Sequence, residues 1–176
     1  METLSSGIQY RHWPAQQAKA CILLIHGLAE HTGRYERLAA YFNARNIAVV
    51  GPDHIGHGAS PGTRAYVAQF SEYLAPLIEL RDAMTGWYPD TPAFMLGHSM
   101  GGLIAAHLLL QDARSYRGAM LSAPAFSADE AGSLVRLWLG WLGFSMWGDL
   151  HCRCSNVAGW FRHADGRRAR RILWPN

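Results

Sequence analysis

The segment FMLGHSMGG at residues 94–102 limits most strongly how this chain can fold. An apolar run of strand length ends at Gly97, a serine follows two residues later, and glycines then open an amphipathic stretch, Leu103 to Leu110, typical of a helix. The pattern predicts a strand, a sharp turn with Ser99 at its apex, and a helix. A turn this tight needs small residues on both sides, so that the serine hydroxyl projects, strained and exposed, above the sheet.

The same turn places the amide of Met100 at the N-terminus of the following helix. Free N–H groups and the helix dipole favour a developing negative charge at that point. A Gly-x-Ser-x-Gly pattern can also occur by chance in an ordinary strand-to-helix turn. The apolar strand before it and the helix after it favour a nucleophile elbow, with Ser99 as the candidate nucleophile.

The rest of the chain alternates between strand-like and helix-like segments. The run CILLI at residues 21–25 is continuously aliphatic, as in a strand buried on both faces. Strands that alternate with helices predict an α/β fold, a mostly parallel sheet with helices on both faces. We expect strands at residues 7–13, 21–25, 47–50, 93–96 and 118–122, and helices at about residues 34–45, 67–88 and 103–110.

Composition agrees with a chain that builds a core, since 49% of its 176 residues are hydrophobic and 16% are charged. Three cysteines are too few for a disulfide framework. No apolar run reaches the length of a membrane span, and the N-terminus does not resemble a secretion signal. We therefore expect a cytoplasmic protein.

Three motifs in order carry a resemblance to a known family: HGLAEHTGRY at residues 26–35, DHIGHGAS at residues 53–60 and LGHSMGG at residues 96–102. Together they resemble the monoacylglycerol lipase and lysophospholipase branch of the α/β-hydrolases, over roughly residues 5–130. The resemblance implies that Ser99 is the nucleophile and that the backbone amides of Leu28 and Met100 form the oxyanion hole. It implies no metal and no organic cofactor.

Four histidines lie within these motifs, and none occupies the position of the family's catalytic histidine. We expect them to orient the loops through hydrogen bonds. They are His26, His54, His57 and His98.

After about residue 132 the sequence departs from the family pattern. A serine nucleophile of this fold needs an Asp or Glu and then a His, each carried after a later strand. No segment after residue 132 has such a strand with these motif residues, although Asp149 and His163 stand in the required order. We therefore expect a partial α/β-hydrolase fold that lacks the last strands and most of the cap, with residues 1–132 as the hydrolase part and residues 133–176 as a Trp- and Arg-rich tail or remnant cap.

Several interpretations of the tail remain open. In the first, the reading frame is disrupted near residue 137. In the second, residues 134–147 form a divergent cap helix over the serine. In the third, the basic run at residues 167–171 binds a nucleic acid or an anionic membrane. A basic terminus is more often a solvated tail. The cluster His151, Cys152 and Cys154 lacks the second spaced pair that a zinc site needs, so free thiols are expected there.

The resemblance implies hydrolysis of a carboxylic ester, with a monoacylglycerol or lysophospholipid as the small lipid substrate. Two alternatives stay open: a catalytically inactive hydrolase fragment without the triad acid and base, and a peptidase of the same fold. We expect no nucleic-acid partner. Peripheral membrane contact and self-association through an uncovered sheet edge are further expectations.

Overall fold

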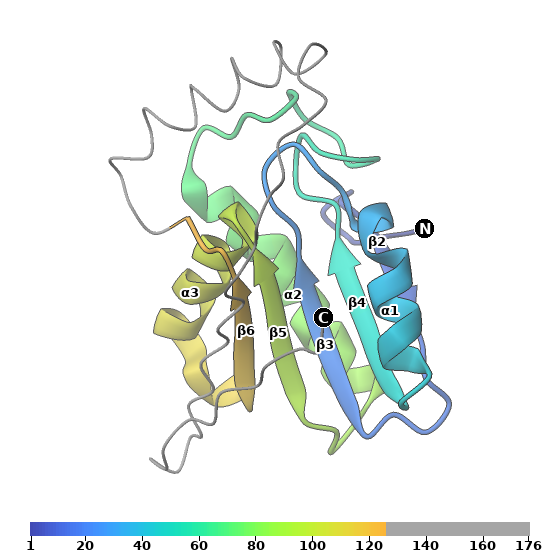
Figure 1. Cartoon of the computed structure of the whole chain (residues 1–176). Helices are drawn as coiled ribbons and strands as arrows, with labels where there is room; N and C mark the ends of the chain where they lie inside the picture. Colours follow the sequence, from blue (N-terminus) through green and yellow to red (C-terminus); the bar gives the residue numbers. More distant parts are fainter. Residues whose placement is uncertain (126–176) are drawn as a thin grey trace, which may run out of the picture.

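Six strands form one sheet in the order β1-β2-β4-β3-β5-β6 in the computed structural model, which describes residues 1–125 (Figure 1). Strand β2 pairs antiparallel with β1 and β4, whereas β4, β3, β5 and β6 are parallel. The strands are β1 (Glu2–Thr3), β2 (Gln9–Trp13), β3 (Ala20–Ile25), β4 (Ile47–Pro52), β5 (Ala93–His98) and β6 (Gly118–Ser122). The helices are η1 (Thr32–Tyr35), α1 (Glu36–Asn43), η2 (Phe70–Tyr73), α2 (Leu74–Trp87), α3 (Met100–Asp112) and η3 (Ala113–Ser115).

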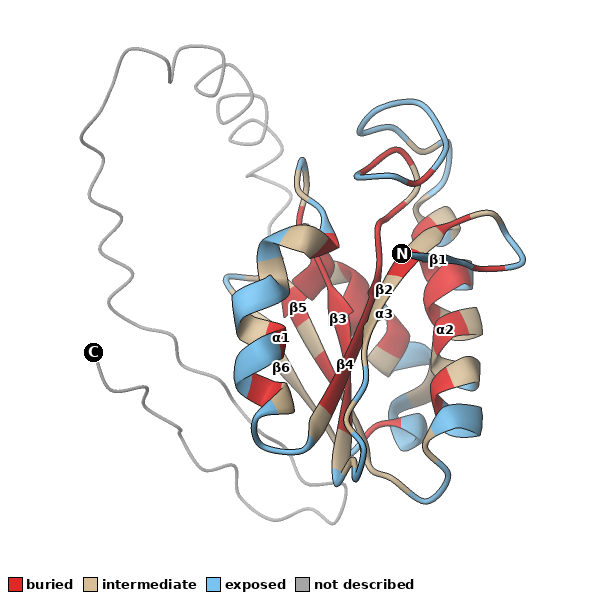
Figure 2. Cartoon of the chain, turned by 90° about the vertical axis from the view of Figure 1, so that its right-hand side faces the viewer, coloured by how far each residue is buried: buried red, intermediate tan, exposed pale blue. Residues whose placement is uncertain are grey.

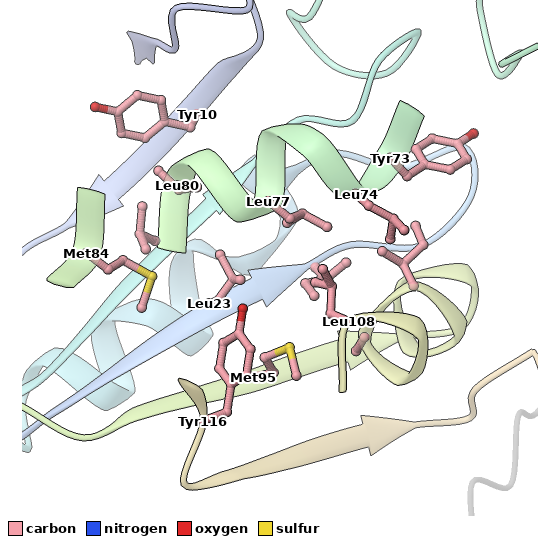
Figure 3. Close-up of a cluster of buried hydrophobic side chains, with 14 of the residues drawn as sticks. Tyr10, Leu23, Tyr73, Leu74, Leu77, Leu80, Met84, Met95, Leu108 and Tyr116 are labelled. Atoms are coloured by element: carbon pink, nitrogen blue, oxygen red, sulfur yellow. The ribbon is translucent and has the colours of Figure 1, made fainter. Parts of the chain in front are cut away.

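Helices cover both faces of this sheet, as the sequence predicts. Helix α1 lies on one face and helices α2 and α3 lie on the other (Figures 1 and 2). Leu23 of β3 and Leu77 of α2 are fully buried in the larger cluster, between the sheet and the α2–α3 layer (Figure 3). Ile22 and Leu24 belong to the smaller cluster under α1. Strand β3 is therefore buried on both faces, which explains its uninterrupted aliphatic run.

The ends of several elements differ from the prediction. Strand β5 continues to His98, so that the elbow follows the sheet without a linker. The segment expected as one helix over residues 67–88 begins at Phe70 as a 3₁₀ turn, because Gln69 and Glu72 form a capping box there. The proline at position 76 is tolerated in the first turn of α2, where its missing N–H is not needed. Strand β1 is two residues long and carries no periodicity from which it could be predicted.

The order of the strands reverses next to β3. The chain leaves β3 for β4 on one side and then crosses back to β5 on the other side. In open α/β sheets, ligands bind at such a switch point, beyond the carboxyl ends of the strands. The loop after β3 and the turn after β5 meet at this point.

Helix α3 packs against the sheet so closely that only glycine fits at position 101 in its first turn. A Cβ atom added to Gly101 would collide with the carbonyl oxygen of Ile25 and lie 2.5 Å from that of His26. A Cβ atom added to Gly97 would lie 2.5 Å from the Gly101 oxygen. Both contacts are to backbone atoms, which cannot turn away as a side chain can. The glycines of the motif therefore set the distance between α3 and the end of β3.

We predict that Gly101→Ala lowers the free energy of unfolding by about 3 kcal/mol or more, because its methyl group has no space. Gly86→Ala is the matched control: Gly86 lies in α2, and an added Cβ would meet nothing within 4 Å. This variant should be as stable as the wild type or slightly more stable. Urea unfolding followed by circular dichroism measures both, and equal stabilities would contradict the packing argument.

Strand β6 is the outermost strand of the sheet in the described part of the chain. It pairs with β5 on one side, and all five of its residues are half-buried. An edge strand presents unpaired backbone groups that can pair with another chain.

We expect the 176-residue chain to self-associate in a concentration-dependent manner through β6. Met120→Lys, which places a charge in this strand, should weaken association by about tenfold, since lysine at an edge opposes strand pairing. Ala113→Lys adds the same charge at an exposed position outside the sheet and should change little. Sedimentation equilibrium measures the effect. A chain that stays monomeric at all concentrations would show that β6 is not available to pair with another chain.

Candidate active site

Ser99 occupies the apex of the turn between β5 and α3. Its φ of 51° and ψ of −117° lie outside the regions that residues with a side chain normally adopt. Such a conformation costs about 1–3 kcal/mol and persists only where the surroundings impose it. The serine is half-buried and stands at the N-cap of α3. This is the strained turn that the sequence predicts.

Backbone hydrogen bonds hold the serine in place from three directions. Its amide donates to the Ser122 oxygen at 2.9 Å, which ties the turn to the end of β6. Its carbonyl oxygen accepts hydrogen bonds from Gly102 of α3 at 2.9 Å and from Ala125 at 3.2 Å. The strained φ is therefore imposed by β6 and α3 together.

Met100 is the first residue of α3. The first amides of a helix have no carbonyl partner within the helix, and the helix dipole adds a partial positive charge at that end. The Met100 amide therefore suits a negatively charged oxygen next to Ser99, although its role as an oxyanion donor stays a prediction.

The loop after β3 lies directly against this elbow. A Cβ atom added to Gly27 would be 3.2 Å from the His98 oxygen and 3.3 Å from the Ser99 Cβ atom. Leu28 follows, half-buried, and Ala29 takes a left-handed conformation with φ of 57°. The structure thus brings Gly27, the residue before Leu28, beside the serine, and the second oxyanion amide of this fold is expected in this loop.

Glu30 holds this loop, a role that the sequence analysis missed. Its Oε1 atom accepts a hydrogen bond from the Gly27 amide at 2.5 Å and another from the Tyr35 hydroxyl at 2.6 Å. Its Oε2 atom lies 3.6 Å from Nε of Arg34. Burial is the main cause that raises the pKa of Tyr35, and the hydrogen bond to Glu30 raises it further. The motif contains Glu30, but its spacing alone does not indicate which amide the carboxylate reaches.

Asp53, also missed, joins the loop after β3 to the loop after β4. Its Oδ1 atom accepts hydrogen bonds from the amide and the hydroxyl of Thr32, at 2.8 and 2.6 Å, and Oδ2 accepts one from the Ala59 amide at 2.9 Å. Burial opposes its charge, but these hydrogen bonds prevail and lower the pKa of Asp53. Gly58 lies so close that a Cβ atom there would overlap this carboxylate.

The four motif histidines take part in loop contacts. His26 and His54 bind each other: the His54 amide donates to Nε2 of His26 at 2.9 Å, and Nε2 of His54 lies 3.1 Å from the His26 oxygen. Burial lowers the pKa of His26 to about 4 and lowers that of His54 as well. Nδ1 of His57 lies 3.0 Å from the Ile55 oxygen, and Nδ1 of His98 lies 3.2 Å from the Ser122 hydroxyl. In the described part of the chain, no imidazole is hydrogen-bonded to the Ser99 hydroxyl.

Some sequence expectations lie outside the described residues. These are the cap helix at 134–147, the basic run at 167–171, the pair Asp149 and His163, and the cluster His151, Cys152 and Cys154. Within residues 1–125, no group of three His, Cys, Asp or Glu side chains is arranged to hold a metal ion. A cavity of about 540 Å³ lies at the amino ends of β3 and β5, between Cys21, Ala93 and Arg117, and its lining contains no residue of the three motifs.

A serine elbow on a mostly parallel sheet, with a glycine loop beside it, defines the α/β-hydrolase class. The comparisons with known proteins agree: a family model described as serine aminopeptidase, S33, matches residues 16–161. The chain belongs to this family. The match continues past residue 132, so the boundary expected there stays a prediction.

The relatives confirm the resemblance to monoacylglycerol lipases. Monoglyceride lipase of Mus musculus is 36% identical over 129 residues, which cover 72% of this chain and 43% of the lipase. Monoacylglycerol lipase of Mycolicibacterium smegmatis is 36% identical over 129 residues, covering 73% of this chain and 46% of that protein. The solved structure of Paleococcus ferrophilus monoacylglycerol lipase matches with a TM-score of 0.63 at 26% identity, covering 81% of this chain and 51% of the other.

The chain therefore spans about half the length of these relatives. None of the helices described in residues 1–125 is long and apolar enough to cross a membrane.

We predict that the free energy of unfolding falls as the pH is lowered from about 6.5 to about 4. An unfolded histidine has a pKa near 6.5, whereas folded His26 has a pKa of about 4, so between these values only the unfolded state binds the proton. His26 alone should contribute about 3 kcal/mol to this fall. His26→Asn should remove that share and leave the slope that His54 contributes, since burial also lowers the pKa of His54. Urea unfolding at a series of pH values measures it, and an unchanged slope in the variant would contradict the buried neutral state of His26.

Proposed function

We propose that this chain carries the nucleophile and the oxyanion hole of a serine hydrolase that cleaves monoacylglycerols. The observation that carries the proposal is the strained Ser99 at the start of α3, with Gly27, the residue before Leu28, packed against it. A structural serine needs neither the positive φ nor the glycine loop. Both features suit a reaction that builds negative charge beside the serine.

In the proposed reaction, the Ser99 hydroxyl oxygen attacks the acyl carbonyl carbon of the ester. The carbonyl oxygen becomes an oxyanion, which the amides of Leu28 and Met100 stabilise by hydrogen bonds. The alcohol then leaves with the proton that the Ser99 hydroxyl gave up, and water hydrolyses the acyl-enzyme, which releases the fatty acid and returns a proton to Ser99. We assign no base among residues 1–125, because no imidazole there is hydrogen-bonded to the serine hydroxyl.

Support for a lipid ester as substrate comes from the relatives, several of which are monoglyceride or monoacylglycerol lipases at 35–39% identity. A related protein of Bacillus subtilis, 35% identical, is a phospholipase, which keeps a lysophospholipid among the substrates to test. A peptide substrate is the second candidate, favoured by the description of the family as serine aminopeptidases.

A fluorophosphonate probe tests the nucleophile in the full 176-residue chain. We expect covalent labelling of Ser99, located by mass spectrometry of the peptide that contains it. Ser99→Ala should abolish labelling. Ser115→Ala, at an exposed serine beyond the far end of α3, should label at the wild-type rate.

Turnover separates the remaining alternatives. Release of fatty acid from a monoacylglycerol, at least 100-fold faster than release of nitroaniline from an aminoacyl nitroanilide, would support the lipase; the reverse order would establish the peptidase. Labelling with turnover of no more than about 10³–10⁴-fold over water would indicate a fragment that has an oxyanion hole but no complete triad. A folded sample that is not labelled would contradict the proposal.

A further inference from the structure

We propose that His26 is a positioning residue that sets the direction of the Leu28 amide, and that His54 fixes the His26 tautomer that does so. The inference rests on the proposed function in one respect: the Leu28 amide matters for chemistry only if it serves the oxyanion. The geometry of the histidines stands independently of that role.

The tautomer of His26 follows from its partners. The His54 backbone amide can only donate, so Nε2 of His26, 2.9 Å away, must be the unprotonated acceptor. The ring proton then resides on Nδ1, which lies 2.8 Å from the Gly27 oxygen and donates to it. The His54 ring makes a second contact between the two residues, since its Nε2 atom lies 3.1 Å from the His26 oxygen. The two residues therefore form a reciprocal clasp between the loops after β3 and β4.

The bond from His26 acts on the peptide that carries the proposed oxyanion donor. The Gly27 oxygen and the Leu28 N–H belong to one planar, trans peptide group, in which they point in opposite directions. Holding the oxygen toward His26 therefore directs the Leu28 N–H away from that ring. The preceding peptide is held too, because the Gly27 amide donates to Glu30. With both peptides fixed, the Leu28 amide cannot rotate without breaking a buried hydrogen bond.

The environment of His26 keeps this arrangement neutral and rigid. The ring is fully buried, with the ring of His54 at 4.1 Å and that of His57 at 5.5 Å between centroids. Asp53, the residue before His54 in the loop after β4, accepts hydrogen bonds from Thr32, which follows the loop after β3. The clasp and the hydrogen bonds between Asp53 and Thr32 therefore attach the two loops to each other at two places.

Two substitutions of His26 separate its two hydrogen bonds. The side-chain amide of Asn reaches about as far as Nδ1 of histidine, so His26→Asn can keep a donor to the Gly27 oxygen while losing the acceptor for His54. The longer Gln reaches about as far as Nε2, so His26→Gln can keep the acceptor but loses the donor. Both are uncharged and similar in size, which makes each the control of the other.

Selective labelling of the full chain reports on the Leu28 amide directly. With ¹³C in the glycine carbonyls and ¹⁵N in leucine, an HNCO spectrum contains only leucines that follow glycine, which are Leu28 and Leu103. Leu103 lies inside α3, where its amide donates to the Ser99 oxygen, and serves as an internal reference. We expect His26→Gln to shift or broaden the Leu28 signal and to leave Leu103 in place. His26→Asn should keep both signals close to wild type.

A kinetic measurement joins the geometry to the proposed chemistry. We expect His26→Gln to slow fluorophosphonate labelling of Ser99 by about tenfold or more, and His26→Asn by less than about threefold. If the wild type is not labelled at Ser99, the proposed function fails, and the Leu28 signal still decides whether His26 positions that amide.

Three results would overturn the proposal. The first is a Leu28 signal that is the same in His26→Gln as in the wild type, or displaced equally in both variants. The second is a wild-type His26 ring with its proton on Nε2 in a long-range ¹H–¹⁵N spectrum. The third is loss of the fold in both variants, which would assign His26 a purely structural role.

Discussion

The arrangement of this site depends on how closely the first turn of α3 approaches the end of β3. Gly101 sits against the carbonyl oxygens of Ile25 and His26, where no larger residue fits. This contact brings the serine at the start of α3 next to the loop that begins with Gly27. The strain at Ser99 is one consequence, since β6 and α3 both hold the turn in a conformation that it would not adopt alone.

A second layer of buried polar contacts fixes the loops above the sheet. Asp53 accepts two hydrogen bonds from Thr32 across the two loops and one from Ala59 within its own loop, and the clasp of His26 and His54 adds two more across the loops. Buried polar groups are costly unless they are paired, so these hydrogen bonds favour one arrangement of the loops over others. Glu30 completes this layer by holding the Gly27 amide. The loop that carries the Leu28 amide, one of the two predicted oxyanion donors, is therefore set by side chains that are not hydrogen-bonded to the serine hydroxyl.

Much of this architecture is readable from the sequence. The aliphatic run around Leu23 predicts a strand buried on both faces, and the glycines around Ser99 predict the elbow. Both patterns are local, because one follows from strand periodicity and the other from the backbone geometry of a tight turn. Leu28 and Met100 could be named only from the resemblance to a family, and their oxyanion role stays a prediction.

The contacts that the sequence did not reveal are not local. Asp53 and Thr32 are 21 positions apart, and His26 and His54 are 28 apart, so neither pair produces a periodic signal. The tautomer of His26 depends on which backbone amide lies opposite its ring, and only the fold determines that. The motifs contain all of these residues, but spacing alone does not indicate which atoms pair.

The central claim is that residues 1–125 hold Ser99 and two backbone amides in a geometry ready to stabilise an oxyanion. A crystal structure of the full chain phosphonylated on Ser99 tests it most directly, because the phosphoryl oxygen stands where the oxyanion would form. We predict that this oxygen lies about 2.7–3.1 Å from the amide nitrogens of both Leu28 and Met100. A phosphoryl oxygen directed to solvent, or bound by neither amide, would contradict the account.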